Sequence, residues 1–348
     1  MTIQKINFPE LTTSSAFVVA DLADAHRATG VVRSAKKILQ DGAKLLARSQ
    51  TYSWAVLQQQ ISGASAGINT QGDERSAAIA GFCEQILSRV ANGELSLDAA
   101  KGVSTSELST LIEADPLLTR RHADFEGTAL GDALLAAGVT AAAAVAIGGL
   151  DGRSFVIEGA GDATIALIRE LVGQGGRVVA VVPPTAGSGG SAGVIELPAS
   201  VDDAIALLSD PSASGSTTGP GDILAVDADV LICGSKSGFI DHESAATLAQ
   251  KAVVPVGSTP ITARGLAVAR RRGIKVLADF VTTAGPMFAE IDPTGEPAAL
   301  IGAARERIDA NCREFAEHPD GDLLAACYKA EEFLGTWRDE LPFGRPIA

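Results

Sequence analysis

The feature of this sequence that most constrains its fold is an alternation of strand and helix patterns between residues 154 and 278. Short apolar runs lie at 154–158, 177–182, 229–233, 252–256 and 274–278, with amphipathic segments between them at 162–173, 201–208, 241–250 and 262–272. Parallel strands need crossover connections, which helices between successive strands provide. The alternation therefore predicts an α/β fold with a mainly parallel, doubly wound sheet and helices on both faces.

The connection between the first strand and the first helix of this series resembles a nucleotide-binding turn. The apolar run Ser154–Glu158 breaks into Gly159-Ala160-Gly161 and resumes at Asp162 with helical periodicity. Glycines permit a tight turn and a close approach to a diphosphate, whose charge the first N–H groups of the helix can bind. The pattern G-x-G-x-x-G would place glycine or alanine at Thr164, so the fingerprint is incomplete. We expect a Rossmann-like domain with an altered dinucleotide site.

Composition narrows the class of partner. The 348 residues are 46% hydrophobic and 20% charged, which predicts a globular chain of two domains or one large one. A formal net charge of -14 opposes attraction to nucleic acid or anionic membranes, so the expected partner is a small molecule. The apolar stretch 133–150 is rich in alanine and glycine and flanked by Asp132 and Asp151, so we expect a buried helix instead of a membrane span. The amino-terminal segment lacks the pattern of a signal peptide.

Cysteine and histidine spacing predicts neither disulfides nor a metal site. The cysteines are far apart and include no C-x-x-C pair, which is typical of reduced thiols in a cytoplasmic protein. The four histidines are scattered and form no H-E-x-x-H motif. We therefore expect a cytoplasmic protein without a bound metal.

The remaining patterns divide the chain into domains. A strand is expected at 15–20, followed by helices at 31–49, 73–92 and 104–114, which together predict an N-terminal α/β domain. Helical patterns at 298–317 and 321–338 are long enough to pack back on the rest of the chain. We expect an N-terminal domain over 1–130, joined by C-terminal helices at 305–348, and a Rossmann-like domain over 131–304.

Five segments, in consistent order, resemble motifs of one enzyme family. Thr51-Tyr-Ser-Trp-Ala55 resembles T-Y-K-N-A, 62–68 resembles G-G-x-K-x-x-I, 102–105 resembles D-V-G-T, 229–235 resembles D-x-x-x-P-C-A, and 278–285 resembles P-D-x-x-x-N-A-G. These are motifs of the glutamate, leucine, phenylalanine and valine dehydrogenases. The resemblance covers roughly residues 15 to 290. It implies a two-domain amino-acid-dehydrogenase-like fold, an NAD or NADP cofactor, and assembly as a homo-oligomer.

Departures from the family pattern fall on its catalytic groups. Two lysines and an aspartate of the family match Ser53, Ser65 and Gly102 here. A serine hydroxyl is a weak acid and a weak base, and losing a charged hydrogen bond to a buried carboxylate costs about 2–5 kcal/mol. Thr259 and Thr283 stand where the family has asparagine. Ordinary oxidative deamination of an amino acid is therefore not expected.

The segments that match the family's cofactor-binding residues are altered less than those that match its catalytic residues. The second strand ends at Val182-Pro183, without the acid that binds NAD ribose hydroxyls. The residues expected to line a NAD or NADP site are Gly159, Gly161, Asp162, Ala163, Thr164, Pro183, Cys233, Gly234, Ser258 and Thr259. The alternative is a Rossmann-shaped domain that binds no nucleotide.

Transfer of the family's geometry predicts a neutral, hydroxyl-lined pocket, which favours an uncharged or modestly polar substrate. Its candidate catalytic residues are Ser65, Ser53, Tyr52, Lys236, Asp279 and Thr283. Three of them have a plainer interpretation: Lys236 as an exposed loop residue, Asp279 as an anchor for its loop, and Tyr52 as packing at a helix end. Cys233 is expected to be a packed thiol and not a nucleophile.

Three functions remain open from the sequence. The first is a divergent NAD(P)-dependent oxidoreductase acting on a neutral small metabolite. The second is a non-redox lyase, isomerase or hydrolase that uses the same cleft. The third is a noncatalytic binding or assembly subunit. The glycine turn and the complete two-domain pattern favour the first, partly by analogy of fold.

Overall fold

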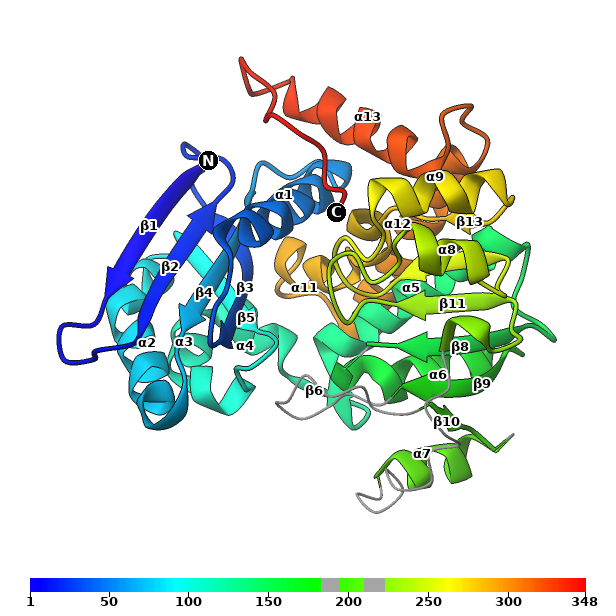
Figure 1. Cartoon of the computed structure of the whole chain (residues 1–348), viewed down its shortest axis with the longest axis horizontal. Coiled ribbons are helices and arrows are strands. Elements are labelled where there is room, and N and C mark those ends of the chain that lie inside the picture. The colour runs from blue at the N-terminus through cyan, green and yellow to red at the C-terminus, as the bar shows by residue number, and fades with distance from the viewer. Residues whose placement is uncertain (160, 183–193, 199, 210–222) are drawn as a thin grey trace. The chain divides into compact units, whose positions relative to one another are not determined.

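The computed structural model describes residues 1–159, 161–182, 194–198, 200–209 and 223–348 (Figure 1). These residues form two compact units. Unit 1 comprises Met1–His122 and Cys327–Pro346, and unit 2 comprises Ala123–Ala326 and Ile347–Ala348. The two units thus divide at residues 122 and 326, where the expected domains were 1–130 with 305–348, and 131–304.

Unit 1 is built on a five-stranded mixed sheet with the strand order β1-β2-β4-β3-β5. Strands β4, β3 and β5 run parallel, and β2 runs antiparallel to both of its neighbours. The strands are β1 (Thr2–Asn7), β2 (Ser15–Ala20), β3 (Ala28–Ala35), β4 (Ser62–Asn69) and β5 (Leu95–Ala99). The helices are α1 (Gln40–Val56), α2 (Arg75–Ala91), α3 (Ser109–Ala114) and α4 (Pro116–Arg121), with short 3-10 turns η1 (Gly72–Glu74) and η2 (Thr105–Leu108).

Each face of this sheet buries its own apolar cluster. Alternate residues of a strand point to opposite faces. Phe17 and Val19 of β2 pack with Ala43 and Ala47 of α1. The larger cluster on the other face takes its members from alternate positions of β2, β3, β4 and β5 and from α2 and α3. Helix α1 therefore covers one face and α2 the other.

Two elements of unit 1 differ from the sequence-based expectation. Residues 28–35 form β3, and α1 begins only at Gln40, so the helix predicted over 31–49 is wrong in its first part. Consecutive β-branched Val31 and Val32 suit a pleated strand better than a helix. Residues 62–69, matched to a loop motif, form the central strand β4. Its small residues give little strand signal, but they let α1 approach: a Cβ added to Gly63 would lie 1.8 Å from the carbonyl oxygen of Ala47.

Unit 2 contains a six-stranded sheet with the order β10-β9-β8-β11-β12-β13. All neighbouring pairs are parallel except β10 with β9. The strands are β8 (Ser154–Glu158), β9 (Arg177–Val182), β10 (Ile195–Glu196), β11 (Val230–Cys233), β12 (Ala252–Pro255) and β13 (Lys275–Val276), and β6 (Asp124–Phe125) and β7 (Thr128–Ala129) form a separate hairpin. The helices are α5 (Leu130–Ile147), α6 (Thr164–Gly173), α7 (Val201–Ser209), α8 (His242–Thr247), α9 (Ala263–Arg271), α10 (Asp279–Thr282), α11 (Phe288–Ile291) and α12 (Pro297–Ala316). The 3-10 turns are η3 (Gly161–Ala163), η5 (Ile223–Ala225) and η6 (Gly285–Met287), and α13 (Asp322–Leu334) crosses the division between the units.

Helices lie on both faces of this sheet, as predicted. Helices α8 and α9 pack with β8, β11 and β12 in one apolar cluster. Helices α5 and α6 contact each other and the strands β12 and β9, and α12 packs on α5. By length and hydropathy α5 could span a membrane, but 61% of it is buried inside the protein. The predicted fold class, a doubly wound α/β architecture, is confirmed.

The contact of α1 with β4 gives the first prediction. Gly63→Ala forces the helix off the strand, because its new Cβ meets two backbone atoms, Ala47 O at 1.8 Å and Thr51 N at 2.6 Å. We expect the free energy of unfolding in urea to fall by roughly 1–3 kcal/mol or more, as overpacking does. The control is Gly42→Ala in α1, where an added Cβ meets nothing within 4 Å. That variant should be neutral or up to about 1 kcal/mol more stable. Equal effects of the two substitutions would contradict this account.

Candidate functional site

The turn after β8 has the backbone conformation for which its glycines were singled out. Gly159 and Gly161 have φ angles of 73° and 57°, in the left-handed region that favours glycine. A Cβ on Gly159 would lie 2.2 Å from the Ser235 nitrogen, so the turn rests directly on the loop that follows β11. A Cβ on Gly161 would meet no atom of the described residues within 4 Å. The first glycine is therefore needed for packing, and the second leaves open space at the start of α6.

The other predicted residues of the turn have distinct environments. The Thr164 hydroxyl donates to the carbonyl oxygen of Gly161 at 2.7 Å, so the residue in the third fingerprint position closes the 3-10 turn η3 that precedes α6. Ala163 is buried, and Asp162 is exposed. Pro183 lies outside the described residues.

A buried carboxylate at this turn was not identified from the sequence. Glu158, the last residue of β8, is 5% exposed. Its Oε2 accepts hydrogen bonds from the backbone N–H groups of Gly234 and Ser235, both at 3.2 Å. Burial, and then the Glu158 charge, raise the pKa of the Cys233 thiol well above its usual value. A protonated, buried thiol fits the packed role expected for Cys233.

The loops after β11 and β12 touch each other at glycines. A Cβ on Gly234 would lie 2.3 Å from the nitrogen of Gly257. Next to this contact, Thr259 has a φ of 51° and its N–H donates to Asp279 Oδ2 at 2.8 Å. The Thr259 and Ser237 hydroxyls hydrogen-bond at 2.8 Å. Ser258 is half-buried.

Asp279 and Lys236, two candidate catalytic residues of unit 2, fit their plainer interpretations. Asp279 is 2% exposed and anchors the Thr259 loop, which is a role that needs no substrate. The Thr283 hydroxyl donates to the carbonyl oxygen of Asp279 at 2.8 Å. Lys236 is exposed. The structure thus brings Thr259, Asp279 and Thr283 together in one hydrogen-bonded group.

In unit 1, Ser65 belongs to a row of side chains on the α1 face of the sheet. Ser65 of β4 and Asp98 of β5 are both register partners of Val31 in β3. Arg33, two residues along β3, points to the same face and its Nη2 lies 3.5 Å from the Ser65 hydroxyl oxygen. The sequence predicted a neutral pocket at Ser65, and Arg33 places a cation there.

Asp98 is the centre of a small charged cluster. Its Oδ1 lies 2.8 Å from His122 Nε2, and its Oδ2 lies 3.3 Å from Arg121 Nη2. Burial of Asp98 opposes its charged form, but the Arg121 charge and the His122 hydrogen bond outweigh burial and hold its pKa below the usual value. The cluster therefore keeps a carboxylate ionised at the edge of the predicted site.

The two other candidates of unit 1 are engaged within the protein. The Ser53 hydroxyl donates to the carbonyl oxygen of Ser49, one turn earlier in α1, at 3.2 Å. The Tyr52 hydroxyl donates to Glu331 Oε1 at 3.0 Å, and Arg345 binds the same carboxylate at 2.6 and 2.7 Å. Burial, followed by the Glu331 charge, raises the pKa of Tyr52. The tyrosine thus ties α1 to α13 instead of offering a free acidic proton.

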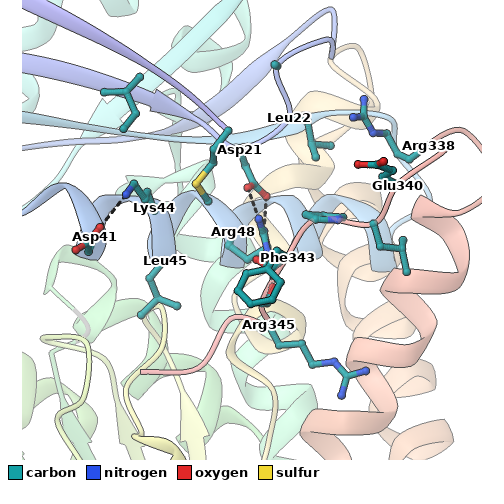
Figure 2. Close-up of a pocket in the computed structure, with 16 residues that line it drawn as sticks. Asp21, Leu22, Asp41, Lys44, Leu45, Arg48, Arg338, Glu340, Phe343 and Arg345 are labelled. Atoms are coloured by element: carbon teal, nitrogen blue, oxygen red, sulfur yellow. Dashed lines mark hydrogen bonds and ion pairs between the residues drawn. The ribbon is translucent and has the colours of Figure 1, made fainter.

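A cavity of about 860 Å³ in unit 1 lies between α1 and the C-terminal segment, residues 338–345 (Figure 2). Figure 2 shows Arg48 of α1 pointing toward Asp21. The two side chains form a bidentate pair at 2.7 and 2.8 Å, and Nη1 of Arg48 donates to the carbonyl oxygens of Phe343 and Gly344. Carboxylate and carbonyl acceptors already bind this guanidinium. We therefore interpret Arg48 as the residue that attaches the C-terminal segment to α1.

Metal ligation finds no support in the part of the chain that the structure describes. There, no group of three or more His, Cys, Asp or Glu side chains could hold a metal ion. The four cysteines are buried and unbridged.

No protein-family model and no curated protein matches the chain. Solved structures resemble it in fold. The hetero-hexameric glutamate dehydrogenase of Thermus thermophilus, in a leucine-bound form, is 19% identical with a TM-score of 0.75, over 95% of this chain and 88% of that chain. The glutamate dehydrogenase of Peptoniphilus asaccharolyticus is 15% identical (TM-score 0.67; 96% of this chain, 91% of that chain). The L-tryptophan dehydrogenase of Nostoc punctiforme is also 15% identical (TM-score 0.62; 96% and 95%). The chain therefore has the fold of the amino-acid dehydrogenases, as the motif order predicted.

The Asp98 cluster gives a prediction with a pH signature. A folded-state pKa below the unfolded value of about 4 means that the charged carboxylate adds stability above pH 4 and loses that contribution as the pH falls through the folded pKa. We expect Asp98→Asn to lower the free energy of unfolding by about 1–3 kcal/mol near pH 6. In urea titrations this deficit should shrink below about pH 4. Glu84→Gln, which removes an exposed carboxylate of α2, is the control and should show neither effect.

Proposed function

We propose that the chain is a nicotinamide-nucleotide-binding oxidoreductase that acts on a small metabolite by a reaction other than ordinary oxidative deamination. The observation that best supports it is the turn at Gly159 and Gly161, which opens α6 at the carboxyl end of β8. The chain passes from β8 to β9 on one side and later to β11 on the other, so β8 borders the point where the strand order reverses. Ligands of doubly wound sheets bind in the crevice at this point.

The residues at this edge fit such a cofactor. Among the described residues, Gly161 leaves free the space that a side chain would fill. The first N–H groups of a helix can bind a diphosphate, and α6 begins directly after this turn. The Glu158 carboxylate opposes a diphosphate by charge, but two backbone N–H groups hold one of its oxygens and partly offset that charge. A bound nicotinamide nucleotide would supply the hydride acceptor or donor. The chain's own residues would position the nucleotide through the turn and the loop of Gly234.

The matched catalytic positions support a reaction other than deamination. Ser53, Ser65 and Gly102 stand where the resemblance places two lysines and an aspartate. None of the three provides a group that titrates near neutral pH. We therefore propose no dehydrogenase activity toward glutamate or tryptophan, the amino acids in the names of the similar structures.

A second candidate is a noncatalytic binding subunit. The hydroxyls expected to act on a substrate already donate within the protein: Ser53 to Ser49, Tyr52 to Glu331, and Thr283 to Asp279. One similar structure is described as a hetero-hexamer, an assembly in which unlike subunits can have different tasks. We propose a cytoplasmic homo-oligomer as the default state and a heteromeric assembly as the form that this second candidate requires.

The turn gives a direct test of nucleotide binding. We expect NAD or NADP at millimolar concentration to raise the melting temperature, because a ligand that binds only the native state stabilises it. Gly161→Ala should abolish the rise, because a methyl group then occupies the space open to the diphosphate. Gly273→Ala is the matched control: its φ is 73° and an added Cβ meets nothing within 4 Å, so it carries a similar strain after α9. The control should keep the rise. No rise with either nucleotide in the wild-type chain would overturn the proposal.

A further inference from the structure

Arg33 is a half-buried arginine of unit 1 for which the described residues provide no counter-ion. Other buried or half-buried arginines of this unit pair with carboxylates: Arg27 with Asp115, Arg48 with Asp21, Arg75 with Glu107, and Arg121 with Asp98. Arg33 pairs with no carboxylate among the described residues. Arg33 therefore differs from these four arginines in having no carboxylate partner among the described residues.

The hydrogen-bonding capacity of Arg33 is almost unused. A guanidinium has five N–H donors. One contact, from Nη2 to the Ser65 hydroxyl oxygen, is 3.5 Å long, at the outer limit of a hydrogen bond. Its Nε is buried and meets no acceptor in the described part of the chain. Burial lowers the pKa of Arg33, so its surroundings already oppose the charge. An anionic acceptor would satisfy these donors and offset that cost.

The surroundings favour an acceptor from outside the protein. Gly67 of β4 is the register partner of Arg33. A Cβ on Gly67 would lie 2.7 Å from the ring of Phe17 and 2.9 Å from Ile38, so apolar groups line this neighbouring position. Asp98, the acid on the same face, is already bound by Arg121 and His122. Neither neighbour can neutralise the guanidinium.

We propose that Arg33 and Ser65 form a binding site for a small oxyanion. The planar guanidinium would bind two oxygens of a carboxylate, or those of a phosphate. Ser65 is fully buried, and its hydroxyl oxygen would hold the guanidinium in place by accepting from Nη2. If the bound anion is the substrate, the inference rests on the proposed function and makes the expected neutral metabolite an anionic one. The existence of the anion site itself depends only on residues of unit 1.

The test follows anion binding at Arg33 itself. The Nε–H signal of Arg33 is assigned in an NMR spectrum of the full chain by its loss in Arg33→Gln. Sodium acetate and inorganic phosphate are then titrated separately at constant ionic strength, and the preferred anion identifies the chemistry. We expect a saturable shift of this signal in the wild-type chain. Ser65→Ala should weaken binding a few-fold, by loss of one hydrogen bond.

Binding constants of the variants separate a site from general attraction. By the melting-temperature shift with the preferred anion, Arg33→Gln should bind at least about tenfold more weakly. Lys37→Gln removes an equal charge from an exposed position four residues away and should bind as the wild type does. Circular dichroism checks the fold, and Arg33→Lys, which keeps the charge but loses the planar fork, should bind with intermediate strength. No saturable shift in the wild type, or equal weakening by Arg33→Gln and Lys37→Gln, would overturn the proposal.

The same proteins distinguish this inference from the proposed function. Nucleotide should raise the melting temperature of Arg33→Gln as much as that of the wild type, because Arg33 belongs to unit 1 and the turn to unit 2. If nucleotide has no effect on either protein while Arg33→Gln still loses the anion, the oxyanion site is supported and the proposed oxidoreductase is not. If both proteins respond to nucleotide and neither binds the anion, the reverse conclusion follows.

Discussion

Close approach of one backbone to another, at residues without a side chain, is the constraint on which both units depend. Helix α1 rests on β4 at Gly63, the turn after β8 rests on the next loop at Gly159, and that loop meets its neighbour at Gly234 and Gly257. These contacts bring main-chain N–H groups, instead of side chains, to the carboxyl edge of the unit 2 sheet. Glu158 is buried there because two of those N–H groups bind it. The polarity of this edge is therefore largely that of the backbone itself.

The sequence predicts unit 2 more fully than unit 1, for a physical reason. Strands β8, β9, β11 and β12 are short, mostly buried runs rich in valine, isoleucine and leucine, and their period contrasts with that of the helices between them. Strand β4 is Ser-Gly-Ala-Ser-Ala-Gly-Ile-Asn, whose residues have low strand propensity, so only its neighbours define it as a strand. The helix predicted from residue 31 hid β3 because apolar residues at helical spacing, with lysines among them, suggested one continuous element over 31–49.

The candidate site is predictable in position but not in partners. Ordered motifs locate Ser65, Asp279 and the glycine turn, because each motif has a fixed place in the fold. Side-chain pairing between distant segments leaves no mark in a single sequence, so neither the Tyr52–Glu331 bond nor the His122–Asp98 pair could be foreseen. Arg33 is missed as a site residue because the sequence pattern assigns residues 31–35 to a helix. It shares a face with Ser65 only because it belongs to a strand that pairs with β4.

The attachment of the C-terminal segment to Arg48 affects the order in which the chain can fold during synthesis. Unit 1 draws on Met1–His122 and on Cys327–Pro346, so its first 122 residues leave the ribosome long before the acceptors at Phe343 and Gly344 exist. Until then the Arg48 and Tyr52 side chains lack part of their final hydrogen bonding. During synthesis, unit 2 can gather most of its contacts from a continuous stretch of chain, whereas unit 1 is completed only after residues 327–346 have been made.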